Sequence, residues 1–355
     1  GPVRSYVMGY DRCQNQVDAS KDEINQMSEI VEKAINAGAL GFSTSRTILH
    51  RDIHGVYVPG TEASSEEMKE LAFAVDRAGE GTLEIVSDWL DQEIEMSWMK
   101  EYVEKSDCGL TVLQTNGDSV KTILYCEEQF LKGKNVRPQF PGRNVGLMFG
   151  LESSLHPFIG HPSYKDISHL PLNERLSIMR DPAFKQKILN ESPSFREDLQ
   201  KAAKEQKSNK TKEEIKAEAE IGKKLISNYE TQFILSDPPN YEPTREDSIA
   251  YLAEQRNQSE EEVIYDELIK DNGKSLIYAC FTPYENHKLE FVETFYKLKS
   301  SVAGGSDGGA HCGLICDASM PTTNLSHWAR DRSAGNKIPL ELIIRYQTKD
   351  TAESF

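Results

Sequence analysis

The sequence predicts an α/β fold built around a parallel sheet, and three observations support it. From residue 3 to residue 140, short strand-like apolar stretches alternate with longer amphipathic stretches, as in parallel sheets with right-handed crossover helices. The length of 355 residues lies within the range of a single α/β barrel. Hydrophobic residues make up 38% of the chain and charged residues 28%, so the chain can bury a core and remain polar outside.

The first elements follow from local patterns. Residues 4–8 alternate polar and apolar side chains, which is typical of a strand. Residues 22–37 carry apolar side chains three and four positions apart and predict an amphipathic helix, with Gly38 as its stop. The next strand is expected over residues 39–45. Ser64, followed by acidic residues, predicts the start of a helix that continues to residue 78.

The same alternation continues to residue 140 and returns near the end of the chain. Strands are expected over residues 82–87, 110–114, 135–140, 275–281 and 302–306, and helices over residues 89–105, 121–131, 289–298 and 339–345. The stretch at 275–281 is short and apolar throughout, so its pattern also fits a helix.

The rhythm changes between residues 157 and 265, where the chain is long, helical and heavily charged. The charge run at 196–224 is interpreted as a solvated helical surface. Residues 172–179 and 183–189 are expected to be helices that could pack onto the sheet as a cap.

Charge and composition exclude several classes of function. The chain has 57 acidic and 41 basic residues and a net charge of −16, which would repel nucleic acid. No stretch approaches the roughly 18 consecutive apolar residues of a membrane span. Six cysteines without a C-x-x-C pair indicate a reducing compartment, so we expect a cytoplasmic protein. The chain begins without methionine and stops in mid-pattern at Phe355, and we expect it to be a piece of a longer protein.

The densest group of candidate catalytic residues lies at 304–312, after the last expected strand. Asp307 stands there among glycines, which let a ligand approach closely, and barrel enzymes carry catalytic groups at the carboxyl ends of strands. Its carboxylate could hold a metal or take a proton from metal-bound water. The alternative is a glycine-rich turn in which Asp307 caps a helix. His311 is interpreted as a polar partner of this loop rather than as a ligand.

Other histidines and cysteines give weaker signals. Cys312 and Cys316 stand four apart without further soft ligands nearby, which favours two small buried residues over a zinc site. His50 and His54 lie in a loop after a strand, which is either a pocket rim or an exposed loop. Two histidines that each precede a proline are expected in turns, namely His156 and His161. The sequence has no G-x-S-x-G, P-loop or dinucleotide-binding motif.

Several segments together resemble the N-acyl-D-amino-acid deacylase (D-aminoacylase-like) family of metal-dependent amidohydrolases. The segments are 4–9, 37–45 and 306–311, with further similarity at 151–164, 180–182 and 327–332. They occur in the same order along the whole chain. The resemblance implies a (β/α)8 TIM barrel of the amidohydrolase type, incomplete at both ends, with a long helical insert before the last strand. Residues 1–150 would supply barrel strands and helices, 151–274 the helical insert or cap, and 275–355 the last barrel strands and a closing helix.

The resemblance also implies hydrolysis of a C–N amide bond other than a peptide bond. The family's aspartate at the end of the last barrel strand falls on Asp307, which would contact the metal and shuttle the proton from attacking water to the leaving amine. Zinc or another divalent metal is the implied cofactor. Four residues match segments that bind the substrate's acid group in the family, and an arginine fork suits a carboxylate: Ser45, Arg46, Arg330 and Arg332.

Part of the family's metal site has no counterpart here. The His-x-His and the cysteine that bind zinc in the family would lie before Gly1. Two further family histidines end the two middle strands, and here those strands end in Asp88 and in Gln114. Asp88 could offer a hard oxygen ligand and Gln114 a weak one.

Two functions therefore compete. The first is a metal-dependent hydrolase of an N-acyl amino acid or a related small-molecule amide, with Asp307 as the proton shuttle. The second is a metal-free, catalytically inactive binding protein that keeps the barrel. A third, weaker reading is a piece that is inert when it is expressed alone, because an open barrel exposes unpaired sheet edges.

Overall fold

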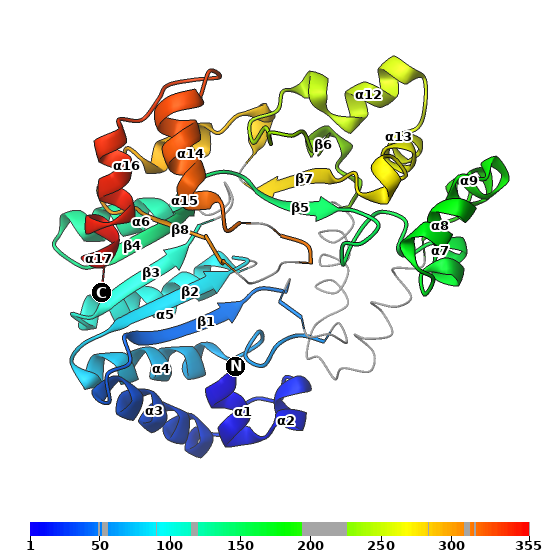
Figure 1. Ribbon diagram of the computed structural model, residues 1–355. Helices are drawn as coiled ribbons and strands as arrows, with labels where there is room; N and C mark the ends of the chain where they lie inside the picture. The colour runs from blue at the N-terminus through cyan, green and yellow to red at the C-terminus, as the bar shows by residue number, and fades with distance from the viewer. Residues whose placement is uncertain are drawn as a thin grey trace.

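The computed structural model describes residues 1–48, 50–51, 56–89, 91–114, 120–193, 226–282, 284–308, 313–315 and 317–354. These residues form two sheets with helices packed against them (Figure 1). One sheet is parallel and its strands come mainly from the first 141 residues, while the other is antiparallel and comes from the middle of the chain. Within the described ranges, no helix has the length and apolar character that a membrane crossing requires.

The parallel sheet confirms the predicted α/β fold. Its strands lie side by side in the order β1 (Gly41–Arg46), β2 (Thr82–Ser87), β3 (Gly109–Leu113), β4 (Val136–Pro141) and β8 (Val302–Gly304). Every adjacent pair is parallel. The first four strands follow one another in chain order, and β8 joins beside β4 after the long middle segment. The α/β class with a parallel sheet is therefore confirmed, while the described residues do not show a barrel.

Two helices beside the first strands begin at serine caps, and the cap at Ser64 is the one that the sequence predicts. Helix α3 (Lys21–Asn36) begins after Ser20, whose side chain and that of Glu23 form a capping box. Helix α4 (Ser65–Ala78) begins after Ser64, whose side chain accepts from the backbone of Glu67. The next two are α5 (Gln92–Lys105) and α6 (Val120–Leu131). In Figure 1, α3 and α4 lie along one side of the sheet, next to β1 and β2.

Strand alternation sends apolar and polar side chains to opposite faces of the parallel sheet. Leu83 and Ile85 of β2 point toward the helices, where they join a core with α4, α5 and α6. On the other face, Glu84 of β2 accepts a hydrogen bond from Gln139 of β4 at 3.1 Å, across β3. Ser43 of β1 is exposed on that same face. The face away from these helices is therefore partly polar and open.

The antiparallel sheet has the order β5 (Val145–Phe149), β7 (Ile277–Thr282) and β6 (Gln232–Ile234). Residues 275–281 were expected to supply a barrel strand. The structure confirms a strand there but pairs it antiparallel with β5 and β6, so it does not belong to the parallel sheet. Its partner β5 follows shortly after β4 in the chain and has no clear signal in the sequence, so the sequence did not predict this antiparallel pairing.

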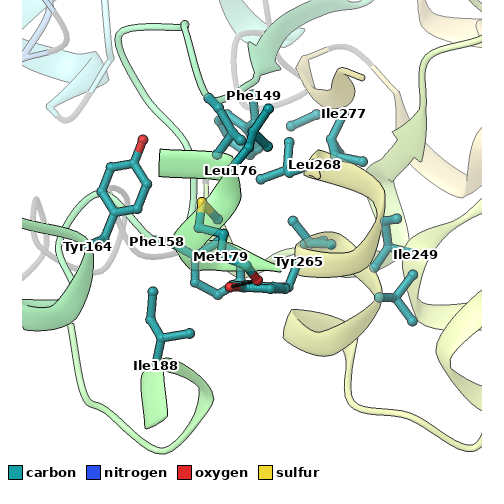
Figure 2. Packing of buried hydrophobic residues seen from close by; sticks show 14 of the residues in the cluster. Phe149, Phe158, Tyr164, Leu176, Met179, Ile188, Ile249, Tyr265, Leu268 and Ile277 are labelled. Carbon is teal, nitrogen blue, oxygen red and sulfur yellow. Dashed lines mark hydrogen bonds between the residues drawn. The ribbon is translucent and has the colours of Figure 1, made fainter. Parts of the chain in front are cut away.

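The middle helices pack against this second sheet. They are α7 (Pro162–Ile167), α8 (Leu172–Met179), α9 (Pro182–Leu189), α12 (Ile249–Arg256) and α13 (Glu260–Leu268), with short turns η2 (Tyr229–Thr231), η3 (Arg245–Asp247) and η4 (Asp271–Gly273). Figure 2 shows their shared core, in which the Tyr265 hydroxyl donates to the carbonyl of Met179 at 2.8 Å. The expected cap helices α8 and α9 thus belong to a core with β5 and β7. The charge run at 196–224 lies outside the described residues.

The last part of the chain returns to the parallel sheet. Turn η5 (Glu285–His287) and helix α14 (Glu290–Phe295) precede β8, and α15 (Met320–Thr323), the π-helix η6 (Asn324–Asp331), α16 (Leu340–Gln347) and α17 (Lys349–Ala352) follow it. Phe140 of β4 stacks on Phe295 with 5.0 Å between the ring centroids. This aromatic core, which includes Tyr296, Trp328 and Tyr346, holds the closing helices onto β4 and β8.

The expected strand at residues 4–8 is wrong. These residues lie in helix α1 (Pro2–Met8), which is followed by α2 (Tyr10–Gln14). Pro2 occupies the first turn, where its missing N–H does no harm. Arg4 and Met8, four residues apart, are both buried on one helix face, and Arg4 pairs with Glu67 of α4 at 3.0 Å. An alternation over five residues is too short to distinguish the two-residue period of a strand from the 3.6-residue period of a helix.

Candidate active site

The carboxyl ends of all five parallel strands meet at one edge of the sheet, because the strands run in one direction. In open α/β sheets and in barrels, ligands bind at this edge. Ser45 and Arg46 end β1, Asp88 follows β2, Gln114 follows β3 and Asp307 follows β8. The structure therefore brings the ends predicted to carry chemistry to one side of the sheet.

Ser45 contacts a histidine at this edge of the sheet. Its Oγ lies 2.7 Å from Nδ1 of His50. The turn between them is fixed by Asp88, because the Thr47 hydroxyl donates to Oδ1 at 2.6 Å and the Ile48 N–H donates to Oδ2 at 2.7 Å. Asp88 thus ties the end of β2 to the loop after β1. His54 lies outside the described residues.

Arg46 points the other way from Ser45. It faces α5, where its Nε donates to Glu95 Oε1 at 2.8 Å. Its guanidinium also donates to the carbonyl of Ala63. Both side chains of the Arg46–Glu95 pair are largely buried, so the charge of Arg46 is compensated within the protein. The pair connects the end of β1 to the first turns of α5.

Gln114 is fully buried, and neither polar atom of its side-chain amide has a hydrogen-bond partner among the residues that the structure describes. Its backbone N–H donates to the carbonyl of Gln139 at 2.9 Å, which continues the β3–β4 pairing. A buried polar group without a partner costs about 1–3 kcal/mol. Such groups are rare in folded proteins and concentrate where a binding or catalytic role offsets their cost.

Asp307 is exposed and lies after the end of β8, with Gly305 and Ser306 in between. Its backbone is left-handed with φ 39°, and Gly305 before it has φ 77°. A left-handed conformation is uncommon for a residue other than glycine, and strained residues of this kind cluster at functional sites. A helix capped by Asp307 would lie in the residues that follow it, and residues 309–312 are outside the described part of the chain. His311, Cys312 and Cys316 lie outside the described residues.

The chain after Asp307 is held between the two sheets. The Met148 N–H donates to the carbonyl of Leu314, and the Ser154 N–H donates to the carbonyl of Gly313, both at 2.7 Å. Further on, Asp317 pairs with the buried Arg143, with 3.4 Å between Oδ1 and Nη2. These contacts place residues 313–315 next to β5. Figure 1 shows the described part of this segment in orange, between the parallel sheet and β5.

The two other predicted substrate-binding residues lie at the end of η6 and differ sharply. Arg330 is exposed and pairs with its neighbour Asp331 at 2.7 Å. Arg332 is 3% exposed. It pairs with Glu242 at 3.0 Å and with Glu293 at 3.1 Å, and its guanidinium lies 4.2 Å from the centroid of the Trp328 ring. Arg332 is therefore engaged entirely by the protein interior.

The partners of Arg332 form a charged cluster inside the aromatic core. His327 Nε2 lies 2.9 Å from Glu242 Oε2. Burial alone would raise the pKa of Glu242, but the hydrogen bonds from His327 and Arg332 outweigh it and lower the pKa to about 2. Glu242 remains ionised at neutral pH and compensates Arg332.

The described residues do not by themselves fit a metal ion. Among them, no three His, Cys, Asp or Glu side chains gather closely enough to hold one. Asp88 already accepts two hydrogen bonds, and Gln114 is an amide. His156 and His161 lie in the middle segment, outside regular helices and strands. Burial, and to a smaller extent the charge of Arg175, lowers the pKa of His156 to about 3.

The sequence did not reveal the contact between Ser45 and His50. The available signal was a serine at the expected end of a strand and a histidine five residues later, in a loop that the sequence predicts to be either a pocket rim or an exposed loop. That spacing has no fixed geometry in a loop. The contact depends on Asp88, which comes from the next strand.

Comparisons of this chain with family models, with curated proteins and with solved structures gave no match.

Proposed function

We propose that this chain is a hydrolase of the amidohydrolase type, which cleaves the C–N bond of an N-acyl amino acid or a related small amide at the carboxyl edge of its parallel sheet. The observation that carries the proposal is the position of Asp307. Its exposed carboxylate follows the last parallel strand in a left-handed backbone conformation. The segment resemblance to N-acyl-D-amino-acid deacylases adds the reaction class.

The fold we propose for the complete site is a (β/α)8 barrel. Strands β1 to β4 lie in chain order and helices α3 and α4 lie on one side of them. Sequential order with helices on one side is the arrangement of a barrel wall, whereas a doubly wound sheet carries helices on both sides. The open polar face with Glu84 and Gln139 would then line the interior of the barrel.

Asp307 is suited to moving a proton. Its carboxylate would take a proton from the water that attacks the amide carbonyl and pass it to the nitrogen of the leaving amine, as a general base and then a general acid. Ser45 is the predicted substrate-binding residue that lies partly exposed at this edge. The guanidinium groups of Arg46 and Arg332 are already paired with buried glutamates.

The resemblance implies zinc or another divalent metal, but the described residues contain no group of three side chains that could bind it. We therefore assign no step to it. A second candidate function, a binding protein without hydrolytic activity, is favoured by Gln114, an amide that stands where the family has a histidine.

The two candidates are separated by hydrolysis assays on the purified chain with a panel of N-acyl amino acids. We expect release of the free amino acid, and we expect Asp307→Asn to abolish it while the thermal unfolding midpoint stays unchanged. The matched control is Asp331→Asn, another exposed carboxylate, which should keep full activity. Metal content is measured on the same samples. Full turnover in Asp307→Asn would remove this residue from the mechanism, and binding of the amides without turnover would favour the binding protein.

A further inference from the structure

We propose that Ser45 and His50 form a nucleophile–base pair that accepts an acyl group from a reactive ester or amide, without the need for a metal. This reactivity is separate from the role given to Asp307. The direct observation is the distance of 2.7 Å between Ser45 Oγ and His50 Nδ1. A serine is a weak nucleophile unless a neighbouring base takes its proton, and a base within about 2.6–3.2 Å is the arrangement that activates it.

The pair is held in place by contacts on both sides. Asp88 binds the turn between Ser45 and His50 through Thr47 and Ile48, which are both buried. The backbone N–H of His50 donates to the carbonyl of Thr47 at 3.3 Å, and its carbonyl accepts from Val58 at the same distance. Asp88 is thus a positioning residue for His50.

The next residue anchors the loop from the far side. The Nε of Arg51 donates to the carbonyl of Ile48 at 3.1 Å, and its guanidinium lies 4.1 Å from the centroid of the Tyr57 ring. The ring of Tyr57 is buried. The backbone around His50 is therefore held on both sides, at Thr47 and Ile48 and at Tyr57 and Val58.

Ser45 is also accessible from the open face of the sheet. Phe42 and Thr44 line a small cavity on the helix side with Met68 and Leu71 of α4. Residues of the other parity in β1, Ser43 and Ser45, therefore face away from the helices. Ser43 is exposed and Ser45 is partly exposed, so an acyl donor can reach the hydroxyl at the carboxyl edge.

The reaction balances with these two groups. With its proton on Nε2, His50 accepts the Ser45 hydrogen bond at Nδ1. As the serine oxygen forms a bond to the carbonyl carbon, its proton passes to Nδ1. The bond from this carbon to the leaving nitrogen or oxygen then breaks, and the leaving group takes that proton. Water hydrolyses the resulting acyl-serine ester by the same route, with His50 accepting the proton of water and returning it to Ser45.

A fluorophosphonate probe tests the pair directly, because a bond forms between the serine oxygen and phosphorus while fluoride leaves. We expect one label on the purified chain, located at Ser45 by tandem mass spectrometry and insensitive to EDTA. The label should be lost in Ser45→Ala and should form about 100-fold more slowly in His50→Gln, as expected for loss of a general base. Ser43→Ala is the matched control on the same strand and face, and it should label at the native rate.

A second measurement keeps the test decisive if a variant folds poorly. In Ser45→Cys, His50 should raise the thiolate fraction, so iodoacetamide should alkylate this cysteine at least about 10-fold faster than the cysteine of Ser43→Cys. The difference should vanish when His50→Gln is added. Equal alkylation rates, labelling of another residue, or unchanged labelling in His50→Gln would overturn the pair. None of these readings depends on Asp307, so the proposed amide hydrolysis can fail or hold independently.

Discussion

Arg332 and Arg330 offer a matched test of how this protein uses arginine, because the family resemblance assigns substrate binding to both. The structure gives them opposite surroundings. The Arg332 side chain is 2% exposed and faces two glutamates, whereas the Arg330 side chain is 74% exposed and pairs only with its neighbour Asp331 among the described residues. Replacing each by alanine should therefore have very different effects on stability.

The magnitude for Arg332 follows from what its removal leaves behind. Among the described residues, Glu242 then keeps only the hydrogen bond with His327, and Glu293 keeps its ion pair with Lys297. Removal of one partner from a buried ion pair costs about 3–5 kcal/mol, because the other charge stays buried. The stacking on Trp328 at 4.2 Å is lost as well. We expect Arg332→Ala to lower the free energy of unfolding by about 3–5 kcal/mol.

Urea denaturation followed by tryptophan fluorescence measures this change, because Trp328 is fully buried in the same core. Arg330→Ala should unfold at the native urea concentration. The reasoning is refuted if Arg332→Ala is as stable as the native protein, or if it keeps its stability and loses affinity for an N-acyl amino acid. In that second case the guanidinium would serve the substrate rather than the core.

Two further predictions concern the same region. The pKa of Glu242 is lowered to about 2 from its usual 4.5, so its contribution to stability is present above pH 4.5 and is lost as the pH falls toward 2. The urea midpoint of the native protein should therefore decline across this pH range, and that of Glu242→Gln should decline less. Parallel curves for the two proteins would contradict the lowered pKa of Glu242. Gly142→Ala should cost about 1–3 kcal/mol by overpacking, because its Cβ would lie 1.6 Å from Asn324 Oδ1. Gly308→Ala should keep the native thermal midpoint, because its Cβ would lie no nearer than 4.0 Å to an atom of the described residues. Equal midpoints for both variants would show that Asn324 yields without strain.

Local signals explain which parts of the fold the sequence could predict. The starts of α3 and α4 are marked by caps that involve only three or four neighbouring residues, namely Ser20 with Glu23 and Ser64 with the acidic residues after it. The strands β2 and β3 were found because their apolar runs are bounded by polar or glycine residues. Such patterns require no knowledge of distant contacts.

The remaining features depend on distant partners. Strand β5 exists because Phe149 and its neighbours pair with Ile277 and the residues after it, more than 120 positions away. Helix α1 is stabilised by the contact of Arg4 with Glu67, which no pattern within residues 2–8 contains. The burial of Arg332 likewise requires Glu242, which lies 90 residues earlier.

The candidate site shows the same division. Asp307 could be found from its glycine-rich surroundings at the end of a strand. The contact of Ser45 with His50 could not, because a loop after a strand takes its shape from Asp88 on the neighbouring strand. The unpartnered amide of Gln114 could not be foreseen either, since burial of a strand-end glutamine depends on the helices around it.

The most direct test of the active-site position is hydrogen–deuterium exchange of the purified chain with and without a saturating N-acyl amino acid. The account predicts slower exchange at the carboxyl ends of the parallel strands, in residues 45–48, 86–89 and 305–308, and unchanged exchange at the opposite edge, in residues 80–82 and 107–109. Protection confined to the opposite edge or to the antiparallel sheet would contradict it.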